Sequence, residues 1–243
     1  MANKDHQTGS ARKDWNLRAR EDFRNAIMST VKGEKGEEEF RRTGVEDAKV
    51  IASFFKGRNM SDWRVLEYGC GVGRLMEPLS RQFGKIHGID ISDEMVKLGR
   101  QRLKGSQFSF HVLENGSLPF SDSCFDLVYS MHVFQHMPKS SFRRLMPEIA
   151  RVLKPGGLFL FHIMYPYTLR RKLQAVFGVD QLSFRHFISV ISEKGQKRVE
   201  TYRRRYYTHG QIEQILDHNG MRLVNRVRLA PKKRYLWNLA ERA

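Results

Sequence analysis

Hydrophobic and polar positions alternate with two different periods along the chain, which predicts strands and helices in turn. Short runs rich in β-branched and aromatic residues predict strands at 64–68, 85–92, 108–113, 125–130 and 158–164. Between these runs apolar residues recur at helical intervals, most clearly over 139–153, before a Lys-Pro-Gly-Gly turn. Strands that alternate with helices indicate an α/β protein built on a parallel sheet.

Other patterns flank this core. On the N-terminal side, the sequence predicts a disordered stretch at 1–12, a helix capped by Asp14 over 14–28, a charged linker at 32–39 and a helix over 45–55. On the C-terminal side, it predicts a basic, aromatic helix over 169–187, an alternating segment at 198–207, a helix capped by Thr208 and a last strand at 221–229. The chain fits one α/β domain with additions at both ends.

A glycine-rich turn follows the first strand directly. It reads Glu67-Tyr68-Gly69-Cys70-Gly71-Val72-Gly73-Arg74 and leads into a helix. Glycine is required where φ is positive or where the backbone comes close to a ligand. A turn between a strand's carboxyl end and a helix is where open α/β sheets bind ligands. A dinucleotide fingerprint would require glycine at position 74, where Arg74 stands, so the spacing disfavours NAD.

A second candidate binding residue ends the second strand. Asp90 lies 23 residues after Glu67, close to the interval of about 20 residues at which an acid meets a ribose in Rossmann-type sites. A carboxylate at that point can accept hydrogen bonds from both ribose hydroxyls. The sequence therefore predicts a ribose-binding role for Asp90.

The Glu-x-Gly-x-Gly-x-Gly pattern closely resembles motif I of the class I S-adenosylmethionine (SAM) dependent methyltransferases, in particular the ubiquinone-biosynthesis-like (methyltransferase type 11) branch. Further positions resemble the same family in the same order along the chain, namely Asp90, 114–120, 131–137 and the Leu-Lys-Pro-Gly-Gly turn at 153–157. The resemblance implies a Rossmann-like, seven-stranded, mostly parallel sheet with helices on both faces and an antiparallel last strand. It also implies a division into a tail with lid helices (1–60), a SAM-binding core (61–165), an acceptor-binding insertion between strands five and six (166–198) and a C-terminal hairpin and helix (199–243).

The resemblance further implies which residues contact SAM, whose product would be S-adenosylhomocysteine. Glu67 would help to hold the amino group, Asp90 the ribose, and Glu114 or its neighbour the adenine, although Glu114-Asn115 departs from the family's usual Asp and small residue. Trp15 and Arg18 are candidates for a lid, or for a plain packing helix. The expected cofactor-binding residues are Glu67, Gly69, Cys70, Gly71, Gly73, Arg74, Asp90, Ile91, Met95, Glu114, Asn115, Gly116, Ser130, Met131, Trp15 and Arg18.

Methyl transfer from SAM is an in-line displacement, so the protein mainly aligns the acceptor and excludes water. A base is needed only if the acceptor loses a proton. Candidate bases are His132, His162, His186 and His209, each with a structural role as the alternative, and His132 comes first because it follows the fourth strand. Two kinds of nucleic-acid base methylation are disfavoured. Enzymes that methylate exocyclic amino groups use an Asp/Asn-Pro-Pro-aromatic loop after the fourth strand, where this chain has Ser-Met-His-Val. Enzymes that methylate cytosine C5 need a nucleophilic cysteine beside a proline or in an equivalent loop, and Cys124 has no such surroundings in the sequence.

The composition of the chain limits the kinds of binding partner and cellular location that can be expected. The net charge is +17, and residues 166–243 hold 17 lysines and arginines against 6 acidic residues, which suggests an acidic partner or a solvated basic face. Cys70 and Cys124 are the two cysteines, so neither a disulfide framework nor a zinc site is indicated. No apolar stretch is long enough to span a bilayer, and a cytoplasmic protein is expected. The sequence does not fix an oligomeric state.

Three functions follow from these observations. The leading one is methyl transfer to a small-molecule or lipid-like acceptor, whose phosphate or carboxylate would be bound by Arg170, Arg171, Arg203, Arg204 or Arg205. The second is RNA methylation, in which the basic C-terminal third binds phosphates and Tyr202, Tyr206 and Tyr207 stack on bases. The third is a SAM-binding regulatory subunit without turnover.

Overall fold

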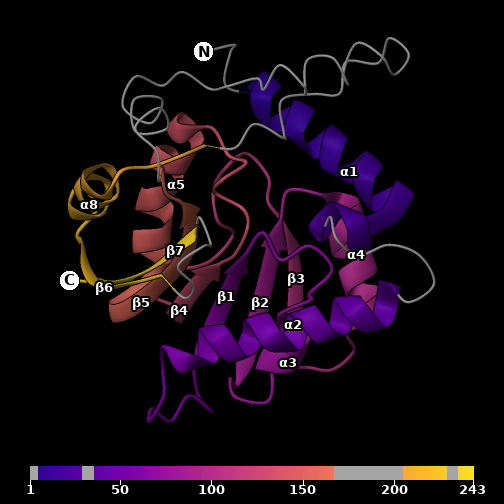
Figure 1. The fold of residues 1–243 in the computed structure, drawn as a ribbon, viewed down its shortest axis with the longest axis horizontal. Coiled ribbons are helices and arrows are strands. Elements are labelled where there is room, and N and C mark those ends of the chain that lie inside the picture. The colour runs from indigo at the N-terminus through magenta and orange to yellow at the C-terminus, as the bar shows by residue number, and fades with distance from the viewer. Residues whose placement is uncertain (1–4, 29–35, 167–204, 229–234) are drawn as a thin grey trace.

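The computed structural model describes residues 5–28, 36–166, 205–228 and 235–243. Within these residues, seven strands form one sheet in the order β3-β2-β1-β4-β5-β7-β6. The strands are β1 Arg64–Tyr68, β2 Lys85–Asp90, β3 Phe108–Val112, β4 Phe125–Ser130, β5 Leu153–Met164, β6 Met221–Val227 and β7 Tyr235–Arg242. Strands β1 to β5 pair in parallel, whereas β7 pairs antiparallel with both β5 and β6. The predicted Rossmann-like fold class is confirmed (Figure 1).

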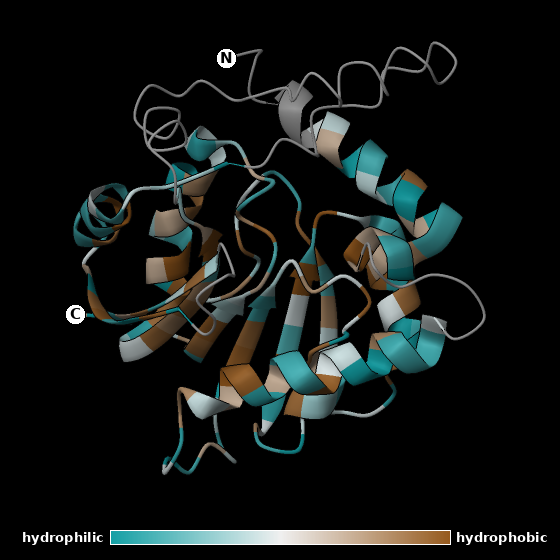
Figure 2. Ribbon diagram, in the orientation of Figure 1, coloured by the Kyte–Doolittle hydropathy of each residue, from teal (hydrophilic) through white to brown (hydrophobic). Residues whose placement is uncertain are grey.

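Helices cover both faces of the sheet. They are α1 Asp5–Ile27, α2 Gly36–Ser53, α3 Met76–Leu79, α4 Asp93–Arg102, α5 Lys139–Val152 and α8 His209–Asp217. The side of β1 that carries Val65 packs with α2 and α3, and the side that carries Leu66 packs with α5 and α8. Figure 2 shows many apolar residues along the central strands and many polar residues along the helices. Helix α1 lies instead across the carboxyl ends of the strands (Figure 1).

The N-terminal boundaries differ from those predicted. Helix α1 already begins at Asp5, so the expected disorder over 1–12 is wrong for residues 5–12. Asp14 is therefore an internal residue of the helix and not its N-cap, and its side chain pairs with Arg18 at 3.0 Å. Helix α2 begins at Gly36, inside the predicted linker, because three glutamates in its first turn interact favourably with the positive helix N-terminus. The acidic residues from which the sequence predicted a linker thus stabilise the first turn of α2.

The last strand is not the one that the sequence predicted. The 221–229 pattern corresponds to β6, and β7 inserts between β5 and β6, where Leu239 lies opposite Leu160. The run 235–242 lacks alternation because it is buried on both faces, and Asn238 interrupts its apolar character. The Asn238 side chain is nevertheless satisfied, since its oxygen accepts from Arg226 Nε at 2.9 Å. Residues 167–204, which include the predicted helix and most of the 198–207 segment, lie outside the described residues.

Strand β5 begins earlier than predicted. It starts at Leu153, opposite Phe125, and the pairing resumes at Leu158 opposite Leu127, with a register shift between them. The predicted Lys-Pro-Gly-Gly turn is therefore an irregular stretch inside the strand, in which Gly156 has a φ of +73°. A bulge of this kind accounts for the turn residues without a break in the sheet.

Two histidines lie side by side on neighbouring parallel strands. Nδ1 of His87 on β2 is 3.3 Å from Nε2 of His111 on β3, and Arg64 donates from Nε to His87 Nε2 at 3.2 Å. The His87 ring also meets Phe120 and Phe125 edge-on. Burial, with a further contribution from the Arg64 charge, lowers the pKa of His87 to about 4.

This histidine pair is expected to make the fold less stable in acid. The folded state keeps His87 neutral, whereas the unfolded chain takes up that proton near pH 6.5. The free energy of unfolding should therefore fall by on the order of 2 kcal/mol as the pH drops from about 6.5 to about 4. Denaturant titrations at several pH values should show a shallower dependence for His87→Phe, which keeps an aromatic ring at this position. Equal pH dependence in both proteins would contradict the expectation.

Candidate active site

The glycine-rich turn connects β1 to the segment that leads into α3. Gly69, Gly71 and Gly73 all have positive φ, at +77°, +53° and +81°. A Cβ on Gly69 would lie 2.2 Å from Cγ2 of Val133, in the loop after β4, so glycine is required there on both conformational and steric grounds. A Cβ on Gly73 would lie 2.7 Å from Leu103 and 2.9 Å from Phe110. Gly73 thus lets the turn pack against α4 and β3.

Two carboxylates lie at the strand ends beside this turn. Glu67 is buried and accepts a hydrogen bond from the Tyr129 hydroxyl at 2.9 Å. Burial raises the pKa of Glu67 to about 8. Asp90 accepts from the backbone N–H groups of Gly71 at 2.8 Å and Ser92 at 2.9 Å, and burial raises its pKa too. Neither carboxylate forms an ion pair with any described residue.

A cavity of about 1000 Å³ opens above these groups, between α1 and the carboxyl ends of the strands. The structure brings together in its wall the predicted residues Glu67, Gly69, Cys70, Gly71, Arg74, Asp90, Ile91, Met95, Asn115, Gly116, Met131, His132, Trp15 and Arg18. Further lining residues that sequence reasoning missed are Asn25, Ala26, Ile27, Met28, Val133, Gln135, His136, Ser141, Arg144 and Tyr235. The missed residues belong to element ends whose approach to the turn is set by tertiary packing.

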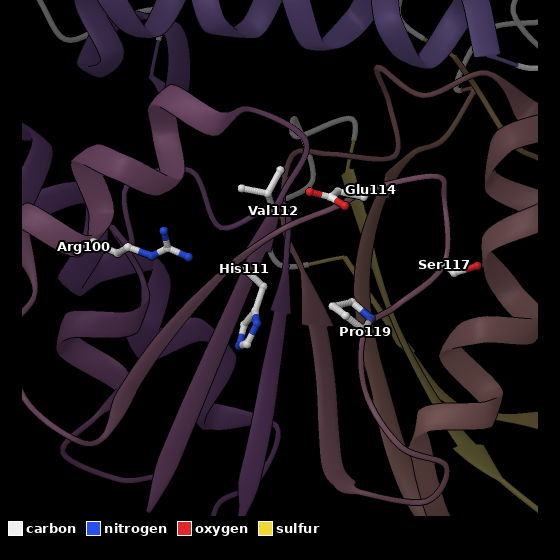
Figure 3. Close-up of a pocket in the computed structure, with 6 residues that line it drawn as sticks. All are labelled: Arg100, His111, Val112, Glu114, Ser117 and Pro119. Carbon is white, nitrogen blue, oxygen red and sulfur yellow. The ribbon is translucent and has the colours of Figure 1, made fainter.

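Three predicted residues lie away from the cavity wall. Gly73 packs against α4 and β3. Ser130 is buried and donates from Oγ to the Tyr68 carbonyl at 2.9 Å, which ties the end of β4 to that of β1. Glu114 is exposed and lines a separate pocket of about 380 Å³, with Arg100 and His111 on one side and Ser117 and Pro119 on the other (Figure 3). The neighbours of Glu114, Asn115 and Gly116, reach the large cavity instead.

Helix α1 is attached to the loops that carry the cavity residues. Arg12 donates to the Leu113 carbonyl at 2.7 Å and pairs with Asp93 at 3.2 Å. Arg20 pairs with Glu94 at 2.7 Å, so the helix is held against the start of α4, directly after Asp90 and Ile91. This attachment directs Trp15 and Arg18 to the cavity. The helix that the sequence offered as a lid or as a plain packing helix thus lies across the carboxyl ends of the strands (Figure 1).

Of the three candidate bases that lie in the described part of the chain, His132 lines the cavity. His132 has a φ of +61°, uncommon for a residue other than glycine, and its ring meets those of His162 and Tyr235 edge-on at centroid distances of 4.6 and 5.3 Å. His162 is buried behind it, between Tyr235 and Trp237. His209 stacks on Tyr165, and His186 lies outside the described residues.

The charges of the cavity fit SAM. A buried carboxylate without an ion-pair partner is costly unless a ligand supplies hydrogen bonds or positive charge. SAM carries an ammonium group and ribose hydroxyls, which match Glu67 and Asp90. Arg74, also in the wall, is already paired with Asp47 at 2.8 Å. Across the described residues, no group of three or more His, Cys, Asp or Glu side chains could hold a metal ion, and no helix is long and apolar enough to cross a membrane.

Comparisons with known proteins agree with this geometry. A family model described as a methyltransferase domain matches residues 66–161. The chain is 30% identical over 180 residues, 71% of its length, to the mitochondrial ubiquinone biosynthesis O-methyltransferase of Mus musculus, and covers 45% of that protein. It is 32% identical over 166 residues, 64% of its length, to the biotin biosynthesis bifunctional protein BioHC of Teredinibacter turnerae, and covers 28% of that protein. The chain thus spans less than half the length of these curated relatives.

The fold also matches solved structures. The crystal structure of magnesium protoporphyrin IX methyltransferase from Synechocystis PCC 6803 with bound SAH superposes with a TM-score of 0.65 at 18% identity, over 97% of this chain and 99% of that chain. The same enzyme has also been solved with bound SAM. Because the matched domain contains the glycine turn and both strand-end carboxylates, the chain belongs to the class I SAM-dependent methyltransferases.

Proposed function

We propose that the protein transfers the methyl group of SAM to a small-molecule or lipid-like acceptor and releases S-adenosylhomocysteine. The observation that carries this proposal is the pair of strand-end carboxylates, the buried Glu67 and the half-buried Asp90, beside the glycine turn in a cavity large enough for more than the cofactor. The relatives in ubiquinone and biotin biosynthesis favour a small-molecule acceptor over RNA.

In this proposal SAM supplies the activated methyl group and the chain supplies its alignment. Glu67 would hold the ammonium group, Asp90 the ribose, and the 113–116 loop the adenine, with Asn115 and Gly116 facing it. Trp15 and Arg18 on α1 would cover the site and exclude water. Glu114, which lies at the separate small pocket, would act only through its neighbours.

The acceptor would bind near the loop after β4. Met131, His132 and Tyr235 line the cavity there, on the side of the turn where Val133 contacts Gly69. If the acceptor must lose a proton, His132 is the residue proposed to take it. A phosphate-binding role cannot be assigned to Arg205, which is buried, and Arg170, Arg171, Arg203 and Arg204 lie outside the described residues.

Incubation of the purified protein with methyl-labelled SAM and a cell extract tests this function. Label in the small-molecule or lipid fraction, reduced in His132→Gln, is the expected result. Label in RNA that is lost as salt is added would favour the RNA alternative. Intact SAM binding without label in any fraction would favour a non-catalytic SAM-binding subunit.

SAM binding is further expected to release a proton at neutral pH. Because the pKa of Glu67 is about 8, the free protein holds this side chain largely protonated at pH 7. An ammonium group placed against it favours the carboxylate, so up to about one proton should leave on binding. Calorimetric titration in two buffers of different ionisation enthalpy measures this release. Glu67→Gln should show less release and weaker binding, and equal release in both proteins would contradict the assignment.

A further inference from the structure

The loop after β4, residues 131–138, forms one wall of the cavity and is held from outside by Arg205. The backbone N–H of Arg205 donates to the Gln135 carbonyl at 2.9 Å, and its guanidinium donates to the His136 carbonyl at 3.0 Å. Arg205 is only 7% exposed. A buried guanidinium bound to a backbone carbonyl fixes the position of that backbone, because its loss leaves polar groups buried without partners.

The segment that carries Arg205 is itself fixed to the sheet. Tyr206 forms a parallel bridge with Met164 at the end of β5, and the Tyr207 N–H donates to the Met164 carbonyl at 3.2 Å. The Tyr207 ring is fully buried, and Lys139 at the start of α5 lies over it at 5.1 Å. Arg205 therefore connects a rigid strand end to the loop that lines the cavity.

On its cavity side, the same loop meets helix α1. The His136 ring hydrogen-bonds to the Gln135 amide at 3.0 Å and meets the Trp15 ring edge-on at 6.3 Å. Both Trp15 and His136 line the cavity. His136 thus lies between the covering helix and Arg205. A shift of the His136 backbone would therefore change the contact between its ring and the Trp15 ring.

From these contacts we propose that Arg205 is a positioning residue for methyl transfer, which acts through Gln135 and His136 to hold the acceptor-side wall against Trp15. This inference rests on the proposed function. The groups proposed to hold the ammonium group, the ribose and the adenine of SAM lie at the ends of β1 and β2 and in the 113–116 loop after β3, whereas Arg205 contacts the loop that contains His132. Loss of the guanidinium should therefore reduce turnover more than SAM affinity, because a displacement of about 1 Å can cost about 100-fold in rate.

The test compares Arg205→Met, Arg205→Lys and a control, Arg222→Met, whose guanidinium lies on the exposed surface of β6. The full-length proteins are assayed for transfer of label from SAM to the fraction that wild type labels, at 20 °C and saturating SAM. We expect a loss of at least tenfold in initial rate for Arg205→Met, partial recovery in Arg205→Lys, and a SAM dissociation constant within twofold of wild type in both.

The outcomes separate the two proposals. A wild-type protein that labels nothing contradicts the proposed function itself. If wild type and Arg222→Met are active, an unchanged rate in Arg205→Met overturns the positioning role, even if its melting temperature falls. An equal loss of SAM affinity and rate overturns the positioning role as well, since it would show that Arg205 supports the structure of the whole protein and not the acceptor-side wall in particular. If Arg205→Met does not fold, a rate for Arg205→Lys equal to that of wild type overturns the role.

Discussion

Replacing Asp90 with asparagine is expected to weaken SAM binding by about 10- to 100-fold. The asparagine keeps the shape of the side chain but removes its negative charge. The carboxylate that carries this charge accepts hydrogen bonds from the backbone N–H groups of Gly71 and Ser92 and, in the proposed complex, from the ribose. Hydrogen bonds to a charged group contribute about 1.5–3 kcal/mol, which corresponds to this range. Equilibrium dialysis with labelled SAM measures the dissociation constant.

A matched variant distinguishes this effect from a general loss of stability. Asp62→Asn removes an exposed carboxylate before β1, at the opposite end of the sheet, and should bind SAM like wild type. Thermal unfolding of both variants without SAM shows whether Asp90→Asn is folded. Unchanged SAM affinity in a folded Asp90→Asn protein would remove Asp90 from the cofactor site.

Gly69→Ala is expected to destabilise the fold and to abolish SAM binding. The new Cβ would lie 2.2 Å from Val133 Cγ2, on a backbone with a φ of +77°. Left-handed backbone strain costs about 1–2 kcal/mol and overpacking about 1–3 kcal/mol, so the free energy of unfolding should fall by roughly 2–5 kcal/mol. Denaturant unfolding and the SAM titration together measure both effects.

Two companion variants separate strain from steric overlap. Gly57→Ala has a comparable φ of +86° with no atom within 4 Å of the new Cβ, so it should show the strain alone. The double variant Gly69→Ala/Val133→Ala removes the overlapping methyl groups and should regain part of the lost stability. If it is no more stable than Gly69→Ala, the contact with Val133 is not the cause.

Much of the central fold could be predicted from the sequence because its signals are local. The strand at 64–68, the positive-φ glycines and Asp90 each depend on a few neighbouring residues, and the observed β1 and β4 have the predicted bounds. The boundaries of α1 and α2 were missed because charged segments are stable as helices once they pair across the fold. Glu37, for example, bonds to Arg102 of α4, 65 positions away, at 2.7 Å.

The candidate site was predictable to a similar degree. Residues in the turn and at strand ends could be found from motif and spacing. By contrast, His136, Arg144 and Tyr235 reach the cavity through the packing of α5, β7 and the loop after β4, which no local pattern encodes. Arg205 shows the same limit, since a run of basic residues suggested an exposed phosphate site and the structure buries this member of it.

The position of β7 has a consequence for how the chain folds during synthesis. Because β7 lies between β5 and β6, the sheet cannot close until residues 235–242 have left the ribosome. Until then β5 is an exposed edge with apolar residues such as Phe159 and Phe161, and an unpaired edge of this kind favours association with other chains. Nascent chains that stall before residue 235 should therefore aggregate or bind chaperones, whereas chains released after residue 242 should not.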